Sequence, residues 1–126
     1  MTASRTFPCR AASVPAARRF VRDVLSEQSR DLAEAAELMA CELATNSVRH
    51  AQAGFELVIQ MQNEIRIEVR DSGQGRPKLL TPRLHDAQGR GLRIVEAMSS
   101  DWGVVAMEGS KAVWFTLTAH PSADGG

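Results

Sequence analysis

A carboxylate and a carboxamide lie four residues apart in one segment of the sequence. Glu42 and Asn46 fall where apolar residues recur at helical spacing, which puts both side chains on one face of a helix. A carboxylate is suited to removing a proton, and an amide oxygen is suited to binding a hard cation. A solvated glutamate followed by an asparagine near a helix end is the alternative interpretation.

Asp71 is a third candidate, because it continues the inward phase of a predicted strand. Ile65, Ile67 and Val69 alternate with charged residues, and the same alternation points Asp71 toward the core. An unpaired buried carboxylate is costly, so this group needs a donor, and the exocyclic amino group of a ligand is one such donor. Alternatively, the strand twists outward and Asp71 caps the next turn.

Two Gly-x-Gly pairs follow Asp71. Gly73 and Gly75 allow the backbone to approach a planar ligand closely. Their pattern differs from the dinucleotide-binding fingerprint, since a proline interrupts any helix there and a third glycine is absent. Gly89 and Gly91 form a better anion cradle, because we expect an amphipathic helix to begin directly after Gly91 and free amides at a helix N-terminus bind phosphate. A flexible loop leading into a helix is the alternative.

The hydrophobic pattern predicts the elements that position these residues. Its period changes from helical to alternating after Gly54. We expect the following elements: a strand at 5–10, a helix capped by Ser13 and running to about Glu27, a helix at 30–51, strands from Phe55 and from Ile65, a lid at 72–89, a short helix after Gly91 and a hairpin at 102–118. This order predicts an α+β fold, a two-layer sandwich whose mostly antiparallel, mixed sheet is covered on one face by about three helices.

Composition and charge narrow the function classes. The 126 residues suffice for one domain, with a core at 10–118 and a disordered tail at 120–126. Fifteen basic residues balance 15 acidic ones, so no net field favours direct contact with nucleic acid. No apolar run approaches the ~20 residues of a membrane span and no signal peptide opens the chain. We therefore expect a cytoplasmic protein without a membrane partner.

Three runs, in order along the chain, resemble the boxes of one protein superfamily. ELATNSVRHA at 42–51 resembles the N box of the Bergerat-fold (GHKL) ATPases and kinases, DSGQG at 71–75 resembles its first glycine box, and GRGL at 89–92 its second. Within that superfamily, DWGV at 101–104 and VWF at 113–115 look most like the actinobacterial single-domain anti-sigma-factor serine/threonine kinases. The resemblance covers roughly residues 10–118.

This resemblance implies a role for each candidate residue. Asn46 would coordinate the Mg²⁺ that bridges the phosphates of ATP, Glu42 would act as general base on the attacking hydroxyl, and Asp71 would accept the adenine amino group. The other implied nucleotide-binding residues come from the two glycine boxes: Gly73, Gly75, Gly89, Arg90, Gly91 and Leu92. Arg90 either touches a phosphate or faces solvent.

Other polar residues carry less chemistry. His50 is interpreted as a packing or capping residue, because Glu42 already fills the role of base. Cys9 and Cys41 lack a CxxC pattern and a histidine at ligand spacing, which favours buried free thiols over a metal site.

The resemblance also implies partners. The chain would phosphorylate a serine or threonine of a STAS-type anti-sigma-factor antagonist and, in its free form, sequester a sigma factor. The alternative is a regulatory module that holds ATP or no nucleotide and acts only by sequestering a partner. The uncovered sheet face or the first strand would allow a homodimer.

Overall fold

The computed structural model describes residues 1–71 and 87–121, and of residues 87–92 and Met107 it describes the backbone alone. The elements follow the predicted order of strand, two helices, two strands, helix and two strands. They are β1 (Thr2–Phe7), α1 (Ser13–Val24), α2 (Arg30–Arg49), β2 (Phe55–Met61), β3 (Glu64–Asp71), α3 (Ala87–Met98), β4 (Asp101–Met107) and β5 (Ser110–Thr118). Gly73, Gly75 and most of the predicted lid lie outside the described residues.

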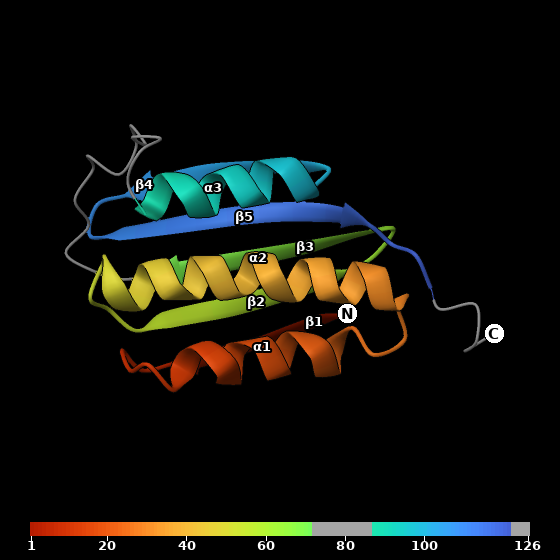
Figure 1. The fold of residues 1–126 in the computed structure, drawn as a ribbon, viewed down its shortest axis with the longest axis horizontal. Coiled ribbons are helices and arrows are strands. Elements are labelled where there is room, and N and C mark those ends of the chain that lie inside the picture. The colour runs from red at the N-terminus through yellow and green to blue at the C-terminus, as the bar shows by residue number, and fades with distance from the viewer. Residues whose placement is uncertain (72–86, 122–126) are drawn as a thin grey trace.

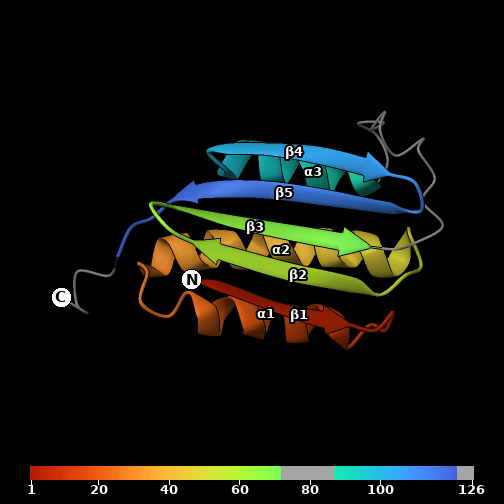
Figure 2. The same ribbon diagram turned by 180° about the vertical axis from the view of Figure 1, so that it is seen from behind.

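The strands form one five-stranded sheet in the order β1-β2-β3-β5-β4. All four pairings between these strands are antiparallel. Helices α1, α2 and α3 lie together on one face of the sheet, and the opposite face carries no helix of the described chain (Figures 1 and 2). The α+β two-layer prediction is therefore confirmed.

The core lies between the helices and the inward face of the sheet. Apolar residues at helical spacing on α1 and α2 meet the alternate residues of β2, β3 and β5, as the two periodicities require. The largest fully buried side chains are Phe55, Phe115, Leu25, Met39, Leu57, Ile59, Ile65, Ile67, Val21 and Val95. Burial of about 25 cal/mol per Å² of apolar surface makes this layer the main stabilising element.

The N-terminal boundaries differ from the prediction. The first strand begins at Thr2 rather than residue 5, and its register with β2 ends at the Phe7–Phe55 pair, before a proline that has no N–H to donate. Ser13 is the first residue of α1 rather than its cap, since its hydroxyl donates to the carbonyl of Pro8 at 2.6 Å. α1 ends at Val24, about a turn before the expected Glu27.

The predicted disordered tail is wrong for its first two residues. The backbone N–H of His120 donates to the Gln28 side chain at 2.8 Å, and the carbonyl of His120 accepts from Ser29 N–H at 2.7 Å. Pro121 forms a β-bridge with Gln28. The end of the described chain is thus tied to the α1–α2 connection, and residues 122–126 lie outside the described part.

The uncovered face of the sheet is built around a buried glutamate. Glu68 on β3 is bonded by the flanking Arg66 and Arg70, and the Arg66 guanidinium lies 4.9 Å from the ring centre of Trp114 on β5. Trp114 in turn pairs with Gly103 of β4.

None of the helices in the described residues is both long and apolar enough to span a lipid bilayer.

Candidate functional site

The C-terminal half of α2 carries the predicted carboxylate and carboxamide. Ser29 caps the helix by accepting a hydrogen bond from the backbone N–H of Leu32 at 3.2 Å, and the helix then runs without interruption to Arg49. Glu42 is half-buried, and Asn46 is buried at 7% exposure. The two residues therefore lie one helical turn apart, as predicted, on the part of α2 that approaches the end of the sheet.

Asp71 lies at the end of β3 and faces the helices. It is 4% exposed, and its Oδ2 accepts a hydrogen bond from the hydroxyl of Ser47 at 3.2 Å. Ser47 directly follows Asn46, so this contact brings the end of β3 to the N-box helix. The predicted inward orientation of Asp71 is confirmed, and the outward-twisting alternative is wrong.

Lys111 is a member of this site that the sequence analysis missed. It continues the inward phase of Val113 and Phe115 on β5 and pairs with Asp71 in the β3–β5 register. Its Nζ lies 3.8 Å from Asp71 Oδ2, and its side chain is 10% exposed. Burial lowers the pKa of Lys111, and the opposing effect of the Asp71 charge does not restore it. Lys111 was missed because β3 and β5 are not consecutive in the chain, so the sequence pattern does not show that these two strands pair.

The second glycine box lies inside a helix rather than before one. α3 begins at Ala87, so the expected helix start after Gly91 is wrong. Helical hydrogen bonding leaves the amide of Gly89 in the first turn without an intrahelical partner, whereas the amide of Gly91 lies in the second turn. α3 packs against α2, and its N-terminal end lies on the same side of the molecule as the C-terminal end of α2 (Figure 1).

His50 and the two cysteines lie at the margins of the site. His50 is the exposed C-cap of α2 and donates its backbone N–H to the carbonyl of Asn46 at 2.9 Å, as a capping residue does. Both cysteines are free, but the expectation that both are buried is wrong, because Cys9 is exposed in the loop after β1. Cys41 is half-buried on α2.

A second polar cluster that the sequence analysis missed joins α1 to α2. Glu37 is 4% exposed, and its carboxylate accepts hydrogen bonds from Arg18 at 3.1 Å and from Arg22 at 3.1 and 3.3 Å. Burial alone would raise the pKa of Glu37, but these two arginines hold it below its ordinary value. The sequence signal was a glutamate on the apolar stripe of α2.

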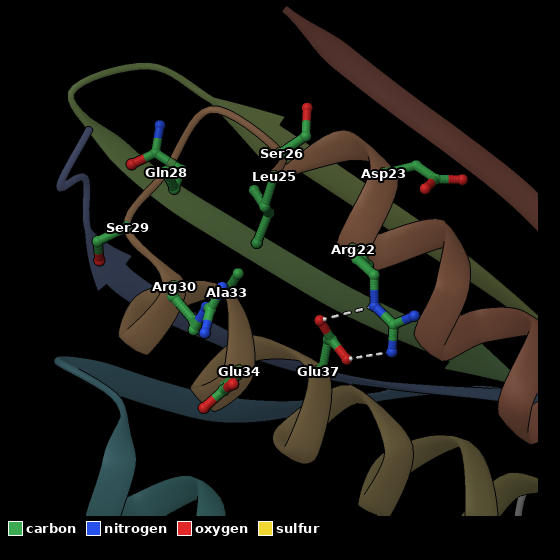
Figure 3. Close-up of a pocket in the computed structure, with 10 residues that line it drawn as sticks. All are labelled: Arg22, Asp23, Leu25, Ser26, Gln28, Ser29, Arg30, Ala33, Glu34 and Glu37. Atoms are coloured by element: carbon green, nitrogen blue, oxygen red, sulfur yellow. Dashed lines mark hydrogen bonds and ion pairs between the residues drawn. The ribbon is translucent and has the colours of Figure 1, made fainter. Parts of the chain in front are cut away.

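Described residues line two cavities. One, of 670 Å³, lies between the end of α1 and the start of α2, where Arg22 faces Glu37 (Figure 3). The other, of 280 Å³, lies at the end of the sheet and includes Asp71 and Ser110 in its wall. Neither is lined by Glu42 or Asn46.

The chemistry of the site follows from what α2, β3 and β5 bring together. They supply a buried carboxylate that contacts both a hydroxyl and a buried ammonium. On α2, Asn46 directly precedes the Ser47 that provides this hydroxyl, and Glu42 lies one turn before Asn46. Within the described residues, no three His, Cys, Asp or Glu side chains converge to hold a metal ion. The carboxylate, hydroxyl and ammonium can therefore form hydrogen bonds with the polar groups of a ligand. The amide oxygen of Asn46 can provide one contact to a cation whose other contacts come from that ligand.

Known proteins share the fold of this chain. The family model described as the histidine kinase-like ATPase domain matches residues 7–117. The crystal structure of the RsbU and RsbW domains of Rv1364c from Mycobacterium tuberculosis superposes with a TM-score of 0.76 at 17% identity, over 97% of this chain and 34% of that one. No curated protein matches the chain.

A second solved structure is more distant. The histidine kinase domain of a blue-light-activated histidine kinase from Erythrobacter litoralis gives a TM-score of 0.56 at 16% identity, over 88% of this chain and 61% of that one. At these identities the two structures share the fold with this chain. This chain spans less than two-thirds of either.

Proposed function

Because this chain belongs to the histidine kinase-like ATPase domain family, we propose that it binds ATP with Mg²⁺ at the end of the sheet where Ser47 contacts Asp71. The donor set fits such a ligand. A buried carboxylate suits an exocyclic amino group, and a carboxamide oxygen suits a hard cation that the phosphates also bind. Asp71 and Asn46 would fill these two roles.

Phosphate binding would use the start of α3. The amide of Gly89 in the first helical turn and the positive end of the helix dipole favour an anion. The predicted phosphate-binding residues at the start of α3 also include Arg90, Gly91 and Leu92. The predicted residues of the adenine pocket still include Gly73 and Gly75.

The activity that we propose is protein serine/threonine phosphorylation. The single observation that carries it is the pair Glu42 and Asn46, held one turn apart on α2 beside the Ser47–Asp71 contact. ATP would supply the phosphoryl group, with Mg²⁺ balancing its charge. Glu42 would accept the proton from the substrate hydroxyl as the hydroxyl oxygen bonds to the terminal phosphorus of ATP and ADP leaves, so that the hydroxyl need not become a free alkoxide.

The substrate that we propose is a STAS-type anti-sigma-factor antagonist, and the partner of the free protein is a sigma factor. This proposal rests on the resemblance of the three boxes to anti-sigma-factor kinases. The fold shared with the RsbW-containing structure supports it.

The test is phosphotransfer to a candidate antagonist. The purified chain is mixed with the antagonist and Mg-ATP, and the intact mass of the antagonist is followed over time, with a reaction lacking ATP as control. The proposal predicts the gain of one phosphate on a serine or threonine. An unmodified antagonist in a reaction where the chain binds both ATP and the antagonist would contradict it.

One observation favours a second function, the sequestering module without turnover. Asp71 is already balanced by Ser47 and Lys111, so its buried charge does not require a ligand. Such a module would bind its sigma factor equally well with and without nucleotide. A nucleotide dependence of that affinity would exclude this second function.

A further inference from the structure

Lys111 is a buried cation beside the carboxylate that we assign to adenine. Asp71 and Lys111 are directly paired across β3 and β5, and both side chains point toward the helices. A lysine buried to this degree is rare unless it has a partner that offsets its lost hydration. Packing alone therefore does not explain why a lysine occupies this buried position.

The contact with Asp71 offsets only part of that cost. The Nζ–Oδ2 distance of 3.8 Å makes an ion pair but exceeds the length of a hydrogen bond, so this contact uses none of the three N–H donors of the ammonium. The pKa of Lys111 stays below its ordinary value despite the neighbouring carboxylate. An acceptor supplied by a ligand would lower the remaining cost.

The two side chains together form a paired acceptor and donor. Among the described residues, Ser47 and Lys111 both contact Oδ2 of Asp71, which leaves Oδ1 as the oxygen that can accept from a ligand. Beside it, Nζ can donate. The edge of adenine presents the complementary order, a 6-amino donor next to the ring nitrogen N1, which is an acceptor.

We propose that Lys111 is a specificity-determining residue of the nucleotide site, which donates a hydrogen bond to N1 of adenine while Asp71 accepts from the 6-amino group. This inference rests on the proposed function, since it assigns an additional contact to the same ATP. The competing account makes Lys111 only a counter-ion that balances Asp71. The two accounts differ in one respect, which is the dependence of binding on N1.

The test is a cycle of two ligands and two proteins. ATP and 1-deaza-ATP, in which a C–H replaces N1, are titrated calorimetrically with Mg²⁺ into the wild type and into Lys111→Met. The wild type should prefer ATP by about tenfold, as expected for a hydrogen bond to a charged donor. Lys111→Met should bind both ligands with nearly equal affinity. Lys111→Gln keeps a neutral donor and should recover part of the preference.

The outcomes separate this inference from the proposed function. Equal preference for ATP in the wild type and Lys111→Met would overturn the role of Lys111 while leaving the nucleotide site intact. A wild type that binds neither ligand would overturn both.

A second measurement needs no substitution at Lys111. Besides Lys78, Lys111 is the only lysine, so a ¹³C-lysine-labelled wild type gives two Cε signals, which Lys78→Met assigns. The signal of Lys111 should shift with ATP and much less with 1-deaza-ATP. Equal shifts with the two ligands would overturn the inference even if Lys111→Met fails to fold.

Discussion

The hydroxyl of Ser47 donates a hydrogen bond to Oδ2 of Asp71 at 3.2 Å, and this contact joins the last turns of α2 to the end of β3. Both groups are almost completely buried, so the bond is protected from competing water. It fixes the direction of the Asp71 carboxylate relative to Asn46, the residue before Ser47. This contact thereby holds together Asp71, which we propose to bind adenine, and Asn46, which we propose to bind the cation.

Glu42→Gln should remove phosphotransfer while leaving ATP binding in place. The amide cannot accept the hydroxyl proton, and loss of a general base lowers the rate by about 10²- to 10⁴-fold. Phosphate incorporation and calorimetric affinity are measured on the same preparation, with Glu34→Gln, at an exposed position of the same helix, as control. An undiminished rate in Glu42→Gln would refute the assigned base.

Glu37→Gln should lower the free energy of unfolding by about 2 kcal/mol at neutral pH, because charge-assisted hydrogen bonds to Arg18 and Arg22 are lost. The pKa of Glu37 is lowered, so its stabilisation is present above the ordinary value of 4.5 and is lost as pH falls through the folded-state pKa. The gap between wild type and variant in urea unfolding should therefore shrink in acid. Glu34→Gln is the exposed control, and a gap that persists in acid would contradict this account.

Gly103→Ala should destabilise the uncovered face of the sheet. A Cβ at Gly103 would lie 2.8 Å from the indole of Trp114, so the ring must move off Arg66 at a cost of about 1–3 kcal/mol. Tryptophan fluorescence and thermal unfolding report both changes. Val105→Ala, at an exposed position of the same strand, should have a smaller effect, and an unshifted spectrum in Gly103→Ala would contradict the predicted contact.

The Lys111 ammonium should make stability rise with pH in the alkaline range. Burial lowers its folded-state pKa below the ordinary 10.5, so between these two values the unfolded chain binds more protons than the folded one. The Asp71 carboxylate faces this ammonium at 3.8 Å, and its charge opposes the effect of burial without cancelling it. Urea unfolding at several pH values up to about 10 should show this rise in the wild type and its loss in Lys111→Met. Parallel profiles would contradict the assignment.

Periodicity was enough to predict most of the fold. The apolar stripe of α2 and the alternation in β2 and β3 are local signals, and these elements appear within one or two residues of their predicted bounds. The start of β1 was missed because strand pairing with β2, rather than local propensity, determines it. The start of α3 was missed because glycine predicts a helix boundary locally, yet it is tolerated inside a helix at a modest cost.

The site was predictable where it depends on one element and not where it depends on two. The Glu42–Asn46 spacing and the inward phase of Asp71 follow from a single helix and a single strand. Lys111 becomes visible only once β5 is placed beside β3, and Arg18 and Arg22 gain their role only when α1 packs on α2. These neighbours come from tertiary packing, which a local pattern does not encode.

The central claim is nucleotide binding beside the Ser47–Asp71 contact, and calorimetric titration of the purified chain with ATP and Mg²⁺ tests it most directly. Asn46→Ala and the shape-preserving Asp71→Asn are titrated in parallel, with Thr45→Ala as the control, since the Thr45 hydroxyl bonds within α2 to the carbonyl of Cys41. The account predicts saturable binding by the wild type and by Thr45→Ala that both site substitutions weaken at least about tenfold. Absence of wild-type binding at millimolar ATP, or equal affinity in all four proteins, would contradict it.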